Sequence, residues 1–107
     1  MSLIYKILPR AEWDAALEAG VFLGSATDIE DGFIHFSTGE QWPETLQKHF
    51  AGQGDLLLVA VEADALGPQL KWEVSRGGSL FPHLYGAMPA GLAVTVAPIP
   101  NPAGGAA

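Results

Sequence analysis

The chain has 107 residues, 49% of them hydrophobic and 16% charged, with a formal net charge of −7 and no cysteine. This length is typical of one domain with one hydrophobic core, and the composition is too apolar for a disordered chain. The excess of 12 acidic over 5 basic residues disfavours binding to the phosphate backbone of extended nucleic acid. The lack of cysteine excludes disulfides, cysteine nucleophiles and thiolate metal ligands.

Segment lengths indicate where the protein resides and how it is divided. The longest apolar run, residues 56–61, is much shorter than the roughly 18 residues that a membrane helix needs. The first residues lack the charged and long apolar regions of a signal peptide. We therefore expect a cytoplasmic protein with no membrane span. We expect residues 1–100 to form a single domain and residues 101–107 to form a flexible tail.

The first half of the chain predicts two strands and two main helices. Residues 3–8 are rich in β-branched and aromatic side chains and predict a strand. Residues 9–20 predict a helix with proline in its first turn, glycine at its end and apolar residues at helical spacing. Residues 21–31 are predicted to be a loop, and residues 32–37 a strand. A hydroxyl side chain at the end of that strand is placed to cap a second helix, which ends near residue 52.

The second half predicts three strands. Residues 56–61 are continuously apolar, as expected of a central strand that is buried on both faces. Residues 70–75 alternate, which predicts that Leu70, Trp72 and Val74 face the core while the residues between them face away. Residues 92–99 predict a last strand, and the elements together indicate an α+β fold.

The strand at residues 32–37 carries a candidate site. His35 and Ser37 share one face of it and present two hydrogen-bonding groups side by side. One interpretation makes His35 a core histidine that is hydrogen-bonded to the backbone. The other makes the pair part of a ligand pocket.

Two more segments provide candidate groups. Glu73 is either a solvated carboxylate, paired for instance with Lys71, or a group in a cleft that orients a ribose hydroxyl or acts as a general base. The segment at residues 81–86 is too aromatic for a merely connecting loop. It either covers an open core edge or presents His83 and Tyr85 as a pocket wall.

These observations predict one pocket in which Glu73 and His35 are the catalytic candidates, and Ser37, His83 and Tyr85 are ligand-binding. Two histidines and one carboxylate are a known metal-binding set, but no two histidines have a close ligand spacing, so no metal is expected. Phosphate-binding glycine loops and the GxSxG serine motif are absent from the sequence. No cofactor follows from it.

The chain resembles a small bacterial family catalogued as domain of unknown function 952. The resemblance covers residues 3 to about 97 and includes Lys-Trp-Glu at residues 71–73. It is most specific in the strings GFIHFS, at residues 32–37, and FPHLYG, at residues 81–86. It implies the small split β-sheet of the ADP-ribosyltransferases with two main helices, and no assigned activity.

A more distant similarity connects GFIHFS to a strand of poly-ADP-ribose polymerases and RNA 2′-phosphotransferases. It implies that His35 lies beside a nicotinamide or phosphate subsite and that Glu73 stands in for the transferase glutamate. Where those enzymes have a His-Gly-Thr type of motif on the first strand, this chain has Lys6-Ile7-Leu8. This departure favours binding over catalysis.

Three functions from different classes remain open after the sequence alone. The first is a pocket protein that binds a nucleotide or ADP-ribose-type ligand, with or without ribosyl transfer or hydrolysis. The second is a binding module that has lost the chemistry. The third is a structural or protein-interaction domain. The sequence leaves open whether the protein is an enzyme, and its oligomeric state.

Overall fold

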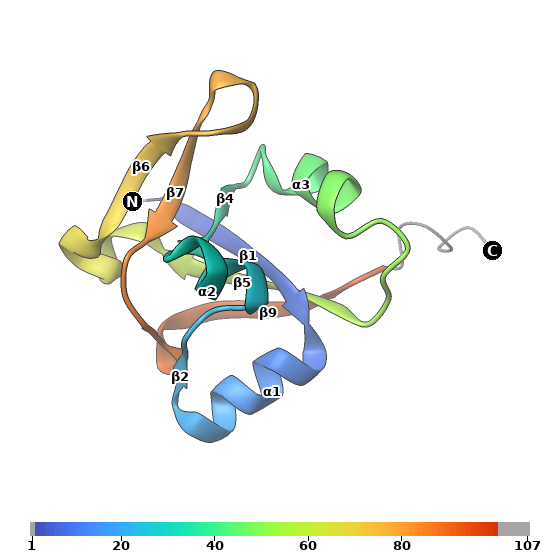
Figure 1. The fold of residues 1–107 in the computed structure, drawn as a ribbon. Coiled ribbons are helices and arrows are strands. Elements are labelled where there is room, and N and C mark those ends of the chain that lie inside the picture. The colour runs from blue at the N-terminus through green and yellow to red at the C-terminus, as the bar shows by residue number, and fades with distance from the viewer. Residues whose placement is uncertain (1, 101–107) are drawn as a thin grey trace.

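The main sheet has four antiparallel strands in the order β4-β1-β5-β9 (Figure 1). The structure is a computed structural model and describes residues 2–100. The strand bounds are β1 Leu3–Pro9, β4 Ser37–Thr38, β5 Leu56–Glu62 and β9 Ala93–Ile99. β5 pairs with β1 on one side and β9 on the other, so the predicted central strand is confirmed.

β5 is covered on both faces, as its uninterrupted apolar sequence predicts. Leu57, Val59 and Val61 point into the main core. Leu56 lies on the other face in a smaller cluster with Leu46, a residue of the third helix. Successive side chains of a strand point to opposite faces, so a strand between two apolar clusters must be apolar at every position.

In the described part of the chain, three α-helices surround the sheets: α1 Arg10–Ala19, α2 Ala26–Asp31 and α3 Trp42–His49. α1 and α3 are the two helices that the sequence predicts. The loop predicted at residues 21–31 is instead the short strand β2 (Val21–Phe22) followed by α2. α2 begins with a capping box between Ser25 and Asp28. This local signal is easy to overlook in the sequence, because the helix that follows has only six residues. Short 3-10 turns occur at Ala63–Gln69, Arg76–Gly78 and Ala90–Leu92.

A second sheet has the strand order β3-β7-β6, and β2 pairs separately with β8. The bounds are β3 Ile34–His35, β6 Leu70–Val74, β7 Leu80–Leu84 and β8 Met88–Pro89. The strand predicted at residues 32–37 is therefore divided: β3 pairs with β7 in the second sheet, while β4 pairs with β1 in the main sheet. This segment connects the two sheets.

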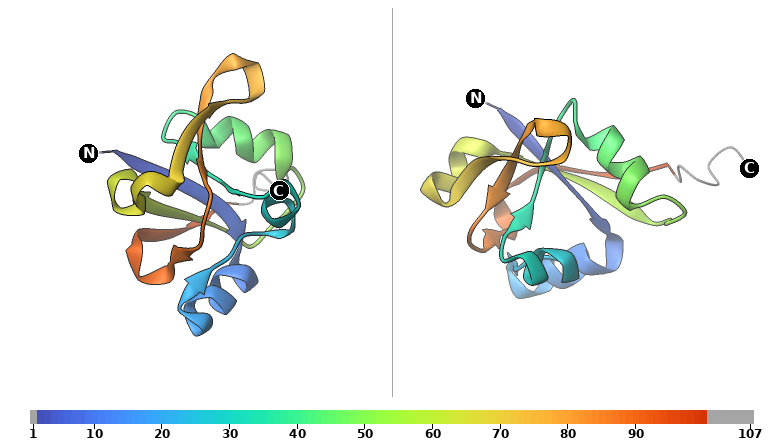
Figure 2. Two further views of the ribbon diagram at one scale, coloured as in Figure 1. Left: turned by 60° about the vertical axis from the view of Figure 1, so that its left-hand side comes forward. Right: turned by 45° about the horizontal axis from the view of Figure 1, so that its top comes forward.

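The strand predicted at residues 70–75 is present as β6, but the predicted burial of its side chains is wrong. Trp72 is 43% exposed and Val74 is 70% exposed, although both were expected to face the core. The β6–β7 hairpin extends beyond the rest of the molecule (Figures 1 and 2), so its far end has no core to face. Near the base of the hairpin Leu70 does pack against the main core.

Helices and antiparallel sheets together give the α+β class that the sequence predicts. The predicted tail, residues 101–107, lies outside the described residues. None of the helices within residues 2–100 has the length and apolarity that crossing a membrane requires.

Candidate functional site

A buried carboxylate, Asp28 of α2, organises the region between the two sheets. The Nζ atom of Lys6 lies 3.0 Å from its Oδ1 and 2.8 Å from its Oδ2. The backbone N–H groups of Ser25 and His35 donate to it over 2.8 Å and 3.1 Å, and Nδ1 of His35 lies 2.6 Å from Oδ1. Asp28 is 2% exposed, so these partners replace all of its water.

The partners of Asp28 decide its charge. Burial by itself raises the pKa of this carboxyl, but the hydrogen bond from His35 and the positive charge of Lys6 outweigh burial and lower the pKa to about 2. Burial lowers the pKa of the Lys6 ammonium, while the charge of Asp28 acts in the opposite direction. Lys6 belongs to β1, so this ion pair fixes α2 on the main sheet.

His35 lies between two carboxylates. Its Nδ1 faces Asp28, and its Nε2 lies 3.0 Å from Oδ2 of Asp31 at the end of α2. Carboxylates only accept hydrogen bonds, so both contacts are satisfied when both ring nitrogens carry hydrogen. The ring is therefore held in one orientation, with its outer nitrogen capped by an exposed acid.

The second imidazole, His83 of β7, also has a carboxylate partner. Its Nδ1 lies 2.8 Å from Oε1 of Glu73, and the hydroxyl of Tyr85 donates to the same oxygen over 2.7 Å. The hydrogen bond from Tyr85, followed by that with His83, lowers the pKa of Glu73. The same bond to Glu73 raises the pKa of the Tyr85 hydroxyl.

The ring of Phe33 joins the two imidazoles. It stacks on His83 with ring centroids 4.2 Å apart, and its centroid lies 4.6 Å from that of His35 and 5.2 Å from that of Tyr85. The cause is the strand register, because β3 pairs with β7 so that His35 is opposite His83. We call Phe33, His35, Glu73, His83 and Tyr85 the ring cluster.

Four of the five residues predicted for one pocket thus lie together, and Ser37 is elsewhere. The hydroxyl of Ser37 lies 3.1 Å from Oγ1 of Thr45 on α3, and Ser37 is buried. The physical reason is the division of the predicted strand. His35 belongs to β3 and Ser37 to β4, which pairs with β1 in the other sheet, so the two side chains have different neighbours.

Sequence reasoning missed Lys6, Asp28, Asp31 and Phe33. Asp28 had a usable signal, since Ser25 and Asp28 have the spacing of a capping box. Asp31 follows Asp28 by one helical turn, so the two acids are on one side of α2. Lys6 gave no such signal, because a lysine in an apolar strand finds its partner only through the tertiary fold.

A shallow hollow adjoins the ring cluster. It has a volume of about 290 Å³, and Asp28 and Phe33 belong to its wall as well as to the surroundings of His35. The rest of its lining is mostly apolar and comes from the segment before α2, from α2 through β3, and from the end of β7 and the chain after it: Leu23, Ile29, Gly32, Ile34, Leu84, Gly86 and Ala87. This volume is near the lower limit for a small-molecule pocket.

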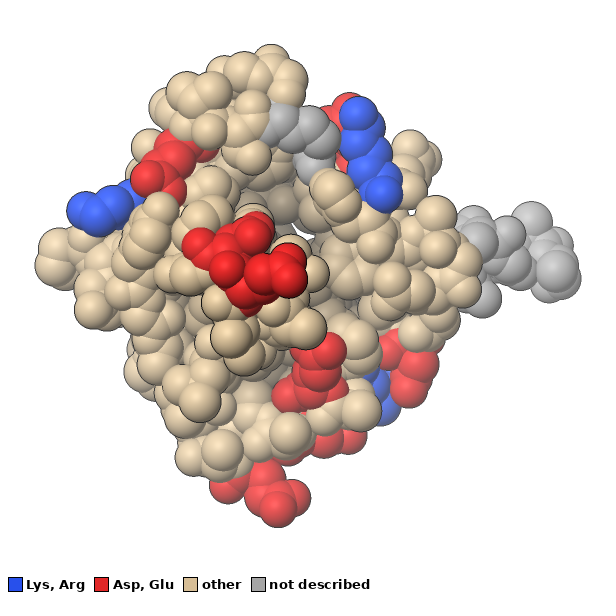
Figure 3. All heavy atoms as spheres, viewed as in Figure 1, with Lys and Arg blue, Asp and Glu red and all other residues tan. Residues whose placement is uncertain are grey.

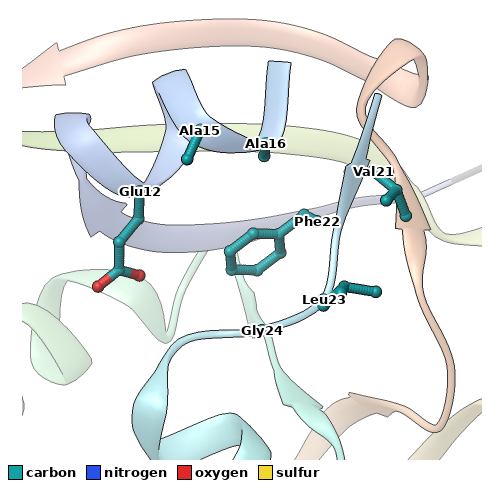
Figure 4. A pocket seen from close by; sticks show the side chains of 7 residues that line it. All are labelled: Glu12, Ala15, Ala16, Val21, Phe22, Leu23 and Gly24. Carbon is teal, nitrogen blue, oxygen red and sulfur yellow. The ribbon is translucent and has the colours of Figure 1, made fainter. Parts of the chain in front are cut away.

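A second hollow lies between α1 and the segment after β2, as Figure 4 shows. Its volume is about 220 Å³, and its lining contains none of the predicted site residues. Glu12 is its one ionisable group, and the hydroxyl of Ser25 donates to that carboxylate over 2.6 Å. The lining of the first hollow also lacks the predicted residues, but it includes Phe33 of the ring cluster and Asp28, the partner of His35. That hollow is therefore the better candidate for a site.

The charge around the ring cluster is acidic. Figure 3 shows acidic side chains over α2, at the centre of the face that is in view. Within the described part of the chain, no three histidine, aspartate or glutamate side chains are placed to hold one metal ion. The expectation of a metal-free protein stays a prediction.

The protein is an α+β domain in which two carboxylate-bound imidazoles pack around one phenylalanine. Residues 7–96 match the family model described as protein of unknown function (DUF952), and the chain belongs to this family. No curated protein matches the chain.

The chain is also similar to solved structures of protein CC0527 from Caulobacter crescentus. The crystal structure is 58% identical in sequence and superposes with a TM-score of 0.89. The match covers 91% of this chain and 85% of the CC0527 chain. The solution NMR structure is 57% identical, with 92% and 85% covered and a TM-score of 0.82. This likeness supports the fold described above for most of the chain.

Proposed function

We propose that this protein binds a small ligand with a ribosyl group, such as a nucleotide or an ADP-ribose-type molecule, at the ring cluster. One observation carries the proposal: His35 and His83 are each oriented by a carboxylate and both pack on Phe33. An imidazole that serves only the core needs one partner, whereas here two imidazoles are oriented against Phe33, a residue that itself lines the adjoining hollow.

The charges favour one end of such a ligand. Asp31 and Glu73 are partly exposed carboxylates at the ring cluster, and carboxylates accept hydrogen bonds from hydroxyl donors. The negative charges of Asp31 and Glu73 repel a phosphate group. The ribose hydroxyls therefore face the cluster, while a phosphate group points away from it toward solvent.

The fold supports the same class of ligand. The resemblance implies an ADP-ribosyltransferase-like split sheet, and the arrangement of two antiparallel sheets joined through the GFIHFS segment supports this proposal. Lys6 occupies the first-strand region in which the transferases carry a ribose-gripping histidine, and it is buried in the ion pair with Asp28. We therefore propose binding as the main function, with His35 and Glu73 as the groups for any ribosyl transfer or hydrolysis. We place the protein in the cytoplasm.

Thermal shift and calorimetry with nucleosides, nucleotides, NAD and ADP-ribose test this proposal. A ligand at 100 times its Kd stabilises the folded state by about 2.7 kcal/mol, which a melting curve resolves. We expect at least one ribosyl compound to bind the wild type, and His83→Ala or Glu73→Gln to weaken that binding at least tenfold. His49→Ala on α3 is the matched control and should bind as the wild type does.

The outcomes separate the alternatives. Product formation from the bound ligand would establish an enzyme. Binding without turnover would establish a binding module. If no ribosyl compound shifts the melting temperature, the ligand proposal is wrong, and the structural or protein-interaction alternative takes its place.

A further inference from the structure

The outer edge of β6 is open and carries exposed apolar side chains. β6 is the last strand of its sheet and pairs only with β7 among the described strands. Trp72, Val74 and Leu80, which is opposite Val74, are 43%, 70% and 51% exposed. Unpaired strand edges with exposed apolar residues are sites where other chains add strands. We propose that β6 pairs with β6 of a second copy of this chain.

The backbone of β6 presents its free groups at the positions that such pairing needs. The N–H of Tyr85 donates to Gln69, and the N–H of Ser75 donates to Ser79, so the odd-numbered residues of this strand bond toward β7. In an antiparallel ladder the alternate residues bond to the opposite side. The N–H and C=O groups of Trp72 and Val74 therefore point to the open edge. At Leu70 only the C=O group is available, because its N–H donates to the C=O of Gly67.

The side chains then select one register. An antiparallel dimer centred on Trp72 pairs Trp72 with its own copy through the N–H and C=O groups of both. It places Leu70 opposite Val74 of the second copy, whose N–H donates to the C=O of Leu70. It also places Lys71 opposite Glu73 of the second copy, and Glu73 opposite the second Lys71. These are non-hydrogen-bonded pairs, in which side chains lie closest, so each opposite-charge contact is favourable.

Neighbouring registers lack this complementarity. Centring the pair on Lys71 places two lysines face to face, and centring it on Glu73 does the same for two glutamates. Like charges directly opposite each other destabilise a sheet. A partner of unrelated sequence has no reason to present the same alternation. The self-complementary pattern of apolar and charged residues therefore identifies a second copy as the occupant.

The dimer has two structural consequences. Two three-stranded sheets become one continuous six-stranded sheet about a two-fold axis. The ring cluster also gains a cation, because Lys71 of the second copy lies beside Glu73, which already accepts hydrogen bonds from His83 and Tyr85. The dimer forms without ligand, so its test is independent of the proposed binding function.

Cysteine cross-linking tests the register directly, because the native chain contains no cysteine. In the proposed dimer the two copies of residue 72 form a hydrogen-bonded pair with Cα atoms about 5.5 Å apart, within disulfide range. We expect Trp72→Cys to form a covalent dimer rapidly under mild oxidation. Leu80→Cys is the matched control: it is at least as accessible, but its two copies are about 20 Å apart, three strand spacings across and four residues along the strands.

Sedimentation velocity over a concentration series tests the charges. We expect the wild type to form dimers as concentration rises, Lys71→Glu to weaken the association at least tenfold, and the double variant K71E/E73K to restore it. Circular dichroism verifies that each variant is folded. A wild type that stays monomeric throughout, equal cross-linking at positions 72 and 80, or no rescue in the double variant overturns the proposal.

Discussion

Asp28 accepts hydrogen bonds from a lysine, an imidazole and two backbone groups, and it is buried. The ion pair with Lys6 connects α2 to β1, and the contact with His35 sets the orientation of a ring in the candidate site. One residue thus links the stability of the fold to the geometry of the site. His35 consequently has a structural task as well as any binding task, so His83 and Glu73 are the cleaner positions for testing ligand binding.

Asp28→Asn should strongly destabilise the protein. It leaves the Lys6 ammonium buried without a counter-charge, and breaking a buried pair by removing one partner costs about 3 kcal/mol or more. Urea unfolding measures the change in the free energy of unfolding. Asp14→Asn on the exposed side of α1 is the control and should change it by less than about 0.5 kcal/mol. Similar losses in both variants would contradict a special function of Asp28.

Tyr85 offers a spectroscopic test of the second imidazole's surroundings. The carboxylate of Glu73 raises the pKa of the Tyr85 hydroxyl, because it accepts its hydrogen bond and disfavours a second negative charge. Glu73→Gln should therefore lower this pKa toward the ordinary value of 10.0. The ultraviolet absorbance of tyrosinate measures it, in a Tyr5→Phe background that leaves one tyrosine. An unchanged titration would show that the contact is absent in solution, and Glu18→Gln serves as control.

At the scale of elements, α2 shows how a short helix can carry a site. It has six residues, begins at a capping box and ends at Gly32, whose φ of 88° is in the left-handed region. A helix of this length is not stable by itself, so its tertiary contacts hold it in place. The chain reverses at Gly32 and leads directly into Phe33 and His35, which explains why Asp28 and Asp31 reach the same imidazole.

Gly32→Ala should therefore destabilise the protein by about 1 kcal/mol through the backbone alone. A Cβ atom at Gly32 meets no atom within 4 Å, so steric overlap with neighbours does not contribute. Gly91→Ala is a matched control, because its Cβ would also lie in open space and its φ is outside the left-handed region. Differential scanning calorimetry should show a lower Tm for Gly32→Ala only. Equal shifts would contradict the conformational explanation.

For the whole molecule, the buried ion pair predicts how stability depends on pH. The folded-state pKa of Asp28 is about 2, below the ordinary value of 3.8, so the folded state holds its proton less tightly than the unfolded state does. This contribution is fully present above about pH 4 and is lost as the pH falls toward 2. The difference corresponds to about 2 kcal/mol.

Urea unfolding at a series of acidic pH values measures this loss. The wild type should lose stability between about pH 4 and pH 2, and Asp28→Asn should lose about 2 kcal/mol less over the same range. Parallel curves for the two proteins would assign acid unfolding to other carboxylates.

The sequence by itself determined the α+β class, the central strand and both main helices, because these follow from local periodicity and uninterrupted apolar runs. It also identified His35, Glu73, His83 and Tyr85 as one set, since each stands out against the pattern expected at its position. Tertiary structure alone decided that Ser37 leaves this set, that Trp72 is exposed, and that Lys6 meets Asp28. Those outcomes depend on which strands pair and where the core ends, and both are fixed by contacts between residues far apart in sequence.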